Sequence, residues 1–345
     1  MLYNFTLLEK ILLKKNIIPH PIIDSLSLVI AGRTIQVSVK LGIFESLKTK
    51  PMKIDEIAMG VNISFEGALV IIDTLENLGY VKLRNDKKYE LTIRSLIFLT
   101  KDSKASLINT IRFSDYVFGA LNNLEENIKR GGPKKVNLSV FTKKEWDIFN
   151  KAMVEIASAN FKEIVNKIPL SKKYKKLLDL GGSHGIHSIA FCSKLPSLKA
   201  IIMDLKPTQK QAQQIITHKH MLDKVSFRVG DFLKDDLGKN FDVVLGFNII
   251  HGLNPTTNQK LTHKIYNALN PKGIYIVMDQ IKDARGKSQL SKLIATTMGV
   301  MLFNQAGGRT YTFNEVSSWM NKTGFRKIEM KKLRDPGSAL IIGSK

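Results

Sequence analysis

The segment from Leu177 to Gly185 combines an apolar strand, one acid and a glycine-rich turn. It contains Asp179 within the strand and glycines at Gly181, Gly182 and Gly185. Glycine lets the backbone approach a ligand closely, and the free N–H groups at the start of the next helix attract a carboxylate or phosphate. This segment therefore predicts a binding site for a small anionic group.

Two further acids stand at the ends of the next two apolar strands. Asp204 ends the second strand, and Gly230-Asp231-Phe232 follows the third. A carboxylate at the second strand tip can accept hydrogen bonds from two ribose hydroxyls. At the third tip, Asp231 can accept from the amino group of an adenine while Phe232 stacks on its face. The three segments together predict a nucleoside ligand.

The turn differs from the dinucleotide fingerprint, because Ser183 stands where that motif has its second glycine. A glycine turn that serves only to reverse the chain is the alternative interpretation. The acids Asp204 and Asp231, both at strand tips, favour ligand binding over that alternative.

In this order and spacing, the three segments resemble the cofactor motifs of class I S-adenosylmethionine methyltransferases. The resemblance implies S-adenosylmethionine as the cofactor. The residues that it implies as cofactor contacts are Asp179, Gly181, Gly182, Gly185, Asp204, Leu205, Gly230, Asp231, Phe232, Phe247 and Asn248.

The likeness narrows to plant-type small-molecule O-methyltransferases and their bacterial relatives acting on polyketides, phenazines and carotenoids. It covers most of the chain from about Ile35. The segments that carry it are Leu41–Phe44, Leu75–Tyr80 and Tyr89–Thr92 in the front half, Phe149–Met153 as a linker motif, and Gly307–Thr310 with Gly324-Phe325 near the end. It implies an acceptor pocket lined by Phe149, Met153, Met298 and Met301.

The family's general base is a histidine after the fourth strand, and His251 occupies the matching position. An imidazole that titrates near neutrality can remove the proton from an acceptor hydroxyl. Gly252 and Leu253 replace the family's Asp-Trp pair, so the motif does not assure a carboxylate that orients the base, and Asp279 is one candidate partner. The alternative is that His251 only caps the segment that follows.

The elements expected around these residues divide the chain in two. From Lys176 onward, apolar strands alternate with helices, which predicts a Rossmann-like α/β sheet of seven strands. Residues 35–99 show helices followed by a hairpin around Asn85–Lys88, typical of a winged helix. We therefore expect a dimerisation domain over residues 1–105, a helical linker contributing to the acceptor pocket over 106–165, and the catalytic domain over 166–345.

A net charge of +23 raises the question of nucleic acid as a partner. The helix expected in the winged domain carries Glu66, Asp73 and Glu76, which phosphates repel, so a DNA-binding regulator is disfavoured. An RNA methyltransferase is also disfavoured, because the Pro-Pro-aromatic tetrad of base-amino methyltransferases is absent after Leu245. A small-molecule acceptor is expected instead. The apolar segments Leu2–Leu13 and Ile22–Ile30 predict a homodimer.

No apolar stretch reaches the roughly 20 residues of a membrane-spanning helix, and the first residues lack a signal-peptide pattern. A cytoplasmic protein is expected. Cys192 is the single cysteine and is expected to pack inside a helix. His184 and His187 lie three residues apart without a carboxylate at ligand spacing, so surface or cofactor-lining positions are expected and no metal site is predicted.

Overall fold

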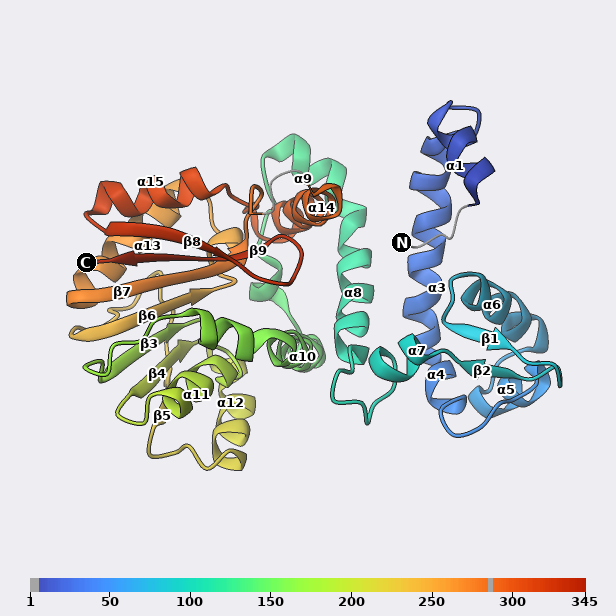
Figure 1. Cartoon of the computed structure of the whole chain (residues 1–345), viewed down its shortest axis with the longest axis horizontal. Coiled ribbons are helices and arrows are strands. Elements are labelled where there is room, and N and C mark those ends of the chain that lie inside the picture. Colours follow the sequence, from blue (N-terminus) through green and yellow to red (C-terminus); the bar gives the residue numbers. More distant parts are fainter. Residues whose placement is uncertain (1–5, 285–287) are drawn as a thin grey trace. The chain divides into compact units, whose positions relative to one another are not determined.

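The computed structural model describes residues 6–284 and 288–345. These form two compact units, the first ending at Tyr116 and the second beginning at Val117 (Figure 1). The division falls inside the helical linker expected over residues 106–165.

The first unit contains the expected order of helices and hairpin. Ser64 caps one helix by accepting a hydrogen bond from the Gly67 N–H, and Gly79 follows its end with φ +76°. The hairpin strands pair antiparallel. The elements are α3 (Leu28–Leu41), α4 (Ile43–Ser46), α5 (Ile54–Val61), α6 (Phe65–Asn77), β1 (Val81–Leu83), β2 (Tyr89–Leu91), α7 (Ile93–Phe98) and most of α8 (Ile108–Ala120).

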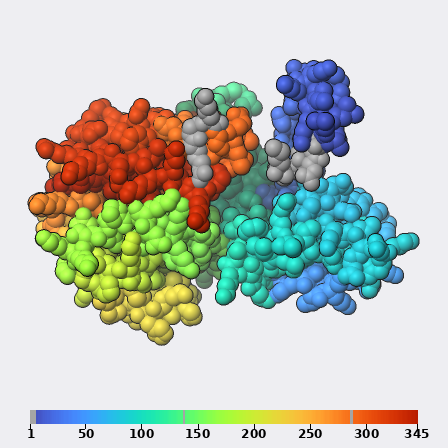
Figure 2. Space-filling model, in the orientation of Figure 1, coloured from blue at the N-terminus to red at the C-terminus, as the bar shows by residue number. Residues whose placement is uncertain are grey.

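The first helices correct one expectation. A π-turn (Ile23–Ser27) joins α2 (His20–Ile22) to α3, so the run His20–Leu41 is 22 residues long with mean hydropathy 1.4. By length and composition it could cross a membrane, although the apolar stretches alone are too short. The dark blue region of Figure 2 shows the surface around α1 (Leu7–Lys14). Residues 2–5 of the predicted Leu2–Leu13 segment lie outside the described residues.

The second unit begins with helices that precede a sheet. Gly131, with φ +87°, ends α9 (Leu124–Arg130) at a Gly-Gly-Pro sequence, which favours the end of a helix. Thr142 and Glu145 form a capping box that begins α10 (Lys143–Lys167). Two short 3-10 turns, Leu121–Asn123 and Asn137–Val140, lie before α9 and α10.

The sheet within the described residues has seven strands in the order β5-β4-β3-β6-β7-β9-β8. The first five pair in parallel, as the apolar strands predicted, whereas β9 runs antiparallel between β7 and β8. The predicted α/β class is confirmed. The strands are β3 (Lys176–Leu180), β4 (Lys199–Asp204), β5 (Val225–Val229), β6 (Phe241–Phe247), β7 (Leu269–Gln280), β8 (Arg326–Lys332) and β9 (Ser338–Ser344).

Helices cover both faces of this sheet (Figure 1). On one face Leu177 packs with residues of α10, α11 (Ile186–Lys194) and α12 (Lys206–His218). On the other Leu178 packs with α13 (Pro255–Ala268) and α15 (Phe313–Thr323). Alternation along the strand places neighbouring leucines on opposite faces. Cys192, on α11, is buried as expected, and burial raises the pKa of its thiol to about 12.

Candidate active site

The ends of β3, β4, β5 and β6 lie beside one another, because these strands are parallel neighbours in the sheet. Residues that follow such strands share one edge, where α/β sheets bind their ligands. The predicted residues Asp179–Gly185, Asp204, Asp231 and His251 are therefore brought to one edge.

The glycine turn is compact because three of its residues adopt the left-handed backbone region. The φ angles are +60° at Gly181, +41° at Ser183 and +74° at Gly185. Glycine takes this conformation without the strain that a side chain brings. Gly185 also begins α11.

The glycines of this turn leave room for other protein atoms. The sequence had predicted instead that they let the backbone approach a ligand. A Cβ at Gly182 would lie 2.4 Å from Cγ of Asp179, and one at Gly185 would lie 2.7 Å from Cδ1 of Ile202. These glycines thus allow the turn to pack on its own strands. Sequence spacing identified the turn but not this function.

Asp179 is buried beneath the turn, and its Oδ2 accepts a hydrogen bond of 2.7 Å from the Ser188 hydroxyl. Burial raises the pKa of its carboxyl to about 7, against the opposing effect of Ser188, and the neighbouring Asp204 raises it further. Its proton is therefore held with an affinity unusual for an aspartate.

Asp204 presents a carboxylate that the backbone holds in one orientation. Its Oδ2 accepts from the Ser183 N–H at 2.8 Å, and its Oδ1 accepts from the Leu205 N–H at 2.6 Å. Burial raises its pKa to about 6, although both hydrogen bonds lower it. An oriented carboxylate of this kind suits a ribose diol.

The tips of β5 and β6 meet the glycine turn at Gly181. A Cβ added there would lie 2.5 Å from Cδ1 of Ile249 and 3.5 Å from Cε1 of Phe232. Phe232 therefore lies against the turn. Asp231 is partly exposed, with Oδ1 accepting from the Leu233 N–H at 3.0 Å and Oδ2 paired with Lys234 at 3.2 Å.

The other residues predicted to contact the cofactor differ in their surroundings. Leu205 and Asn248 are exposed, and Asn248 has φ +55°. Gly230 makes room for Met203, whose Cε would lie 2.8 Å from an added Cβ. Phe247 is buried with its ring 5.0 Å from that of His187, so the side chain belongs to the core.

His184 and His187 are buried, so a surface position is wrong for both. Burial lowers the pKa of His184 to about 3 and that of His187 to about 4, which keeps both rings neutral. Among residues 6–284 and 288–345, no group of three His, Cys, Asp or Glu side chains could hold a metal ion.

The turn carries polar atoms that lack a partner within the described residues. These are Oδ1 of Asp179 and Oγ of Ser183, both buried. Buried polar atoms are rarely left without a hydrogen bond. With the carboxylate of Asp204 beside them, they fit a small ligand that bears amino, carboxylate and hydroxyl groups.

His251 lies in a 3-10 turn, η4 (Ile250–Gly252), which begins three residues after the last residue of β6. Its Nδ1 lies 2.6 Å from Oδ1 of Asp279, a fully buried acid near the end of β7. The Gln280 N–H also donates to that oxygen at 2.7 Å, and the His251 N–H donates to Oδ2 at 3.3 Å. The predicted partner of His251 is therefore in contact with it.

This contact determines the chemistry of the imidazole. A carboxylate accepts hydrogen bonds, so this contact favours the tautomer that carries its proton on Nδ1 and leaves the lone pair of Nε2 free. No hydrogen bond to Nε2 is present among the described residues. The cap of the following helix α13 is Asn254, which accepts from the Thr257 N–H at 2.9 Å. The capping alternative for His251 is therefore wrong.

The four predicted acceptor residues lie on two helices. Phe149 and Met153 are partly buried on α10, which packs on α12, and Met298 and Met301 are partly buried on α14 (Gln289–Ala306), which packs on η4. The sequence did not delimit α14.

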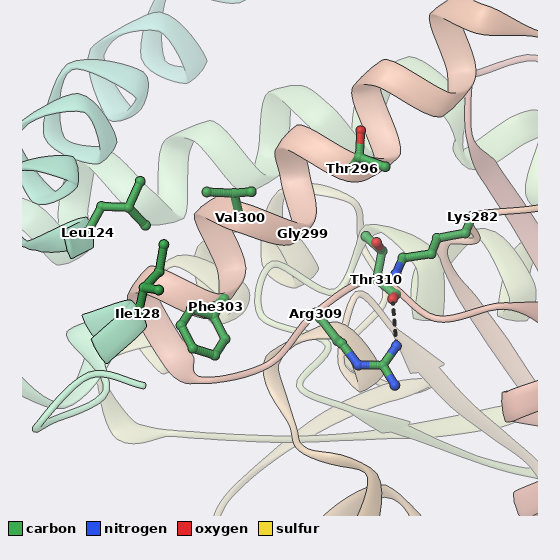
Figure 3. Close-up of a pocket in the computed structure, with 9 residues that line it drawn as sticks. All are labelled: Leu124, Ile128, Lys282, Thr296, Gly299, Val300, Phe303, Arg309 and Thr310. Carbon is green, nitrogen blue, oxygen red and sulfur yellow. Dashed lines mark hydrogen bonds between the residues drawn. The ribbon is translucent and has the colours of Figure 1, made fainter. Parts of the chain in front are cut away.

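A pocket of about 250 Å³ lies on another side of α14 (Figure 3). At 100° per residue, Met298 and Met301 point away from the α14 residues that line it. This pocket is therefore separate from the predicted acceptor wall and from His251. Its lining comprises Leu124, Ile128, Lys282, Thr296, Gly299, Val300, Phe303, Arg309 and Thr310.

The amino-acid sequence of this chain is similar to those of known proteins. A model of the O-methyltransferase domain family matches residues 132–326, more than half of the chain. The chain is 25% identical over 320 residues to the tetracenomycin polyketide synthesis 8-O-methyltransferase TcmO of Streptomyces glaucescens, covering 91% of this chain and 93% of that protein.

Two other similar proteins extend the comparison. An uncharacterized protein of Methanocaldococcus jannaschii is 28% identical over 248 residues, which cover 70% of this chain but only 64% of that relative's length. The crystal structure of human N-acetylserotonin methyltransferase in complex with S-adenosylmethionine superposes with a TM-score of 0.80 at 22% identity, covering 92% of this chain and 94% of that one.

Proposed function

We propose that this chain, which belongs to the O-methyltransferase family and takes its methyl group from S-adenosylmethionine, uses His251 as a general base. In this proposal the methyl group goes to a hydroxyl of a small aromatic, quinoid or isoprenoid molecule. The observation that carries it is the 2.6 Å contact between Nδ1 of His251 and the buried Asp279.

The chain's own residues account for binding and proton transfer. Asp204 would hold the ribose, Asp231 and Phe232 the adenine, and the glycine turn the amino acid end. S-adenosylmethionine supplies an electrophilic methyl group on a sulfonium sulfur. When the methyl group passes to the acceptor oxygen, its bond to sulfur breaks and S-adenosylhomocysteine leaves; Nε2 of His251 would take the hydroxyl proton, and Asp279 would stabilise the resulting imidazolium.

A panel of acceptors tests the acceptor class. The purified protein is incubated with S-adenosylmethionine and phenols, hydroxyquinones or isoprenoid alcohols, and the products are identified by mass spectrometry. We expect one methyl group to be added to a free hydroxyl, and no addition to the matching methyl ethers. Methylation of the ethers at carbon or of amine analogues would contradict the proposal.

We also propose that a second copy of the chain covers the apolar surface of the first helices. Leu26 and Ile30 are 55% and 53% exposed, four residues apart on the run His20–Leu41. That run also carries Asp24, Arg33 and Lys40, which are costly in lipid. A cytoplasmic homodimer accounts for both features better than a membrane anchor.

Light scattering tests this dimer. The wild type is expected to be a dimer at micromolar concentration, and the double variant Leu26→Asp with Ile30→Asp is expected to be a monomer, because two charges would be buried without partners. Leu222→Asp, at a 67% exposed position of the second unit, should remain dimeric. A monomeric wild type, or wild type bound to lipid vesicles, would refute the interface.

A further inference from the structure

We propose that Gly308 is a positioning residue for the methyl transfer, and that a side chain at this position would displace the catalytic histidine. This inference rests on the proposed role of His251. A Cβ added to Gly308 would lie 2.0 Å from the carbonyl oxygen of His251 and 2.7 Å from the carbonyl carbon of Gly252. Cβ atoms essentially never approach other atoms below 3.0 Å.

Position 308 lacks room for a side chain, whereas its backbone conformation does not require glycine. The neighbouring Gly307 has φ +73° and ends α14, so glycine there is explained by the helix terminus. Gly308 is outside the left-handed region, and another residue could adopt its backbone angles. The demand for glycine at position 308 therefore comes from the turn that carries His251.

The segment around Gly308 is anchored and cannot easily retreat from an added methyl group. The Arg309 guanidinium contacts Glu315 at 2.5 Å and lies over the ring of Tyr311 at 4.3 Å. The Thr310 hydroxyl donates to the carbonyl of Ala295 at 3.0 Å. Figure 3 shows Arg309 and Thr310 beside the pocket on α14. An alanine at position 308 would therefore move the turn η4.

The turn η4 is also held from two other directions. The Tyr311 hydroxyl donates to the carbonyl of Leu253 at 2.5 Å. The buried amide of Asn258 donates to the carbonyls of Ile250 at 2.9 Å and Leu253 at 3.3 Å. Gly308 thus completes a backbone support for His251, while Asp279 holds its ring.

The test measures kcat, acceptor KM and S-adenosylhomocysteine affinity for Gly308→Ala and Tyr311→Phe. A displacement of about 1 Å in a reacting group can cost about 100-fold, so Gly308→Ala should lower kcat by about 10- to 100-fold. Tyr311→Phe adds no volume and should lower kcat less. Acceptor KM and S-adenosylhomocysteine affinity should stay within a factor of about three. Gly60→Ala, on α5, is the matched control, because its Cβ would meet only Cε of Met52, at an ordinary contact distance of 3.6 Å.

A double-mutant cycle separates positioning from a general structural role. In a His251→Ala background, Gly308→Ala should lower kcat no further, because the group that it displaces is gone. Equal losses in both backgrounds would overturn the positioning proposal. If His251→Ala alone left kcat unchanged, the general base itself would be refuted. Should Gly308→Ala fail to fold, Tyr311→Phe tests the same support, and unchanged kcat with Tyr311→Phe would then refute it.

Discussion

Replacing His251 by alanine is expected to lower the rate of methyl transfer by about 100- to 10,000-fold, the usual contribution of a positioned general base. Affinity for S-adenosylhomocysteine should change by no more than a factor of a few, because in the proposed site Asp204 and the glycine turn, and not His251, hold that ligand. Single-turnover kinetics and calorimetry measure the two quantities separately.

The pH dependence gives an independent check. A general base acts only in its unprotonated form, so the wild-type rate should rise with pH and then level off. The His251→Ala rate should follow the ionisation of the acceptor alone. A weakly acidic acceptor is required, since an ionised phenolate needs no base. His263→Ala, at an exposed position on α13, serves as the control. Wild-type turnover by His251→Ala would place the base elsewhere.

The second large effect concerns the stability of the ligand-free protein. Burial raises the pKa of Asp179 from 3.8 to about 7, so the folded protein keeps a proton that the unfolded chain releases between these values. Stability therefore falls as pH rises through this window. At about 1.4 kcal/mol per tenfold change in proton affinity, the loss at pH 8 approaches about 4 kcal/mol. Asp179→Asn should remove this loss.

Urea denaturation at pH 5 and pH 8 measures the effect. The stability of Asp179→Asn relative to wild type should increase between the two values, because asparagine does not ionise and its oxygen can still accept from Ser188. Asp236→Asn, at an exposed position, should show no such increase. S-adenosylmethionine must be absent, since ligand binding adds its own stabilisation. A constant difference between Asp179→Asn and wild type would show that Asp179 is not desolvated.

Much of the sheet could be predicted because its strands are short apolar runs bounded by glycine, proline or charge. The apolar runs Val225–Val229 and Phe241–Phe247, which the sequence predicts as strands, are β5 and β6 to the residue, and the run Leu177–Leu180 misses only the first residue of β3. The antiparallel orientation of β9 could not be predicted from the sequence, because an apolar run such as Ala339–Gly343 has the same pattern in a parallel and in an antiparallel strand. The joining of α2 to α3 through a π-turn was not predicted, because the expected apolar segment Ile22–Ile30 covers only part of the run His20–Leu41.

The site was predictable where contacts follow strand order. Asp204, Phe232 and the glycine turn meet because parallel strands end at one edge, and the pairing of His251 with Asp279 follows from the adjacency of β6 and β7. The contact of Gly308 with the His251 carbonyl joins positions 57 residues apart through α14. No spacing rule reveals a contact that depends on how a helix returns to the sheet.

Cys192 has a practical consequence for experiments on this protein. Its thiol is the single one in the sequence, it is 2% exposed, and its raised pKa leaves almost no reactive thiolate at neutral pH. Maleimide fluorophores or spin labels would therefore not react with the native thiol. A cysteine introduced at any exposed position could be modified selectively without first removing Cys192, so distance measurements can use the otherwise unaltered enzyme.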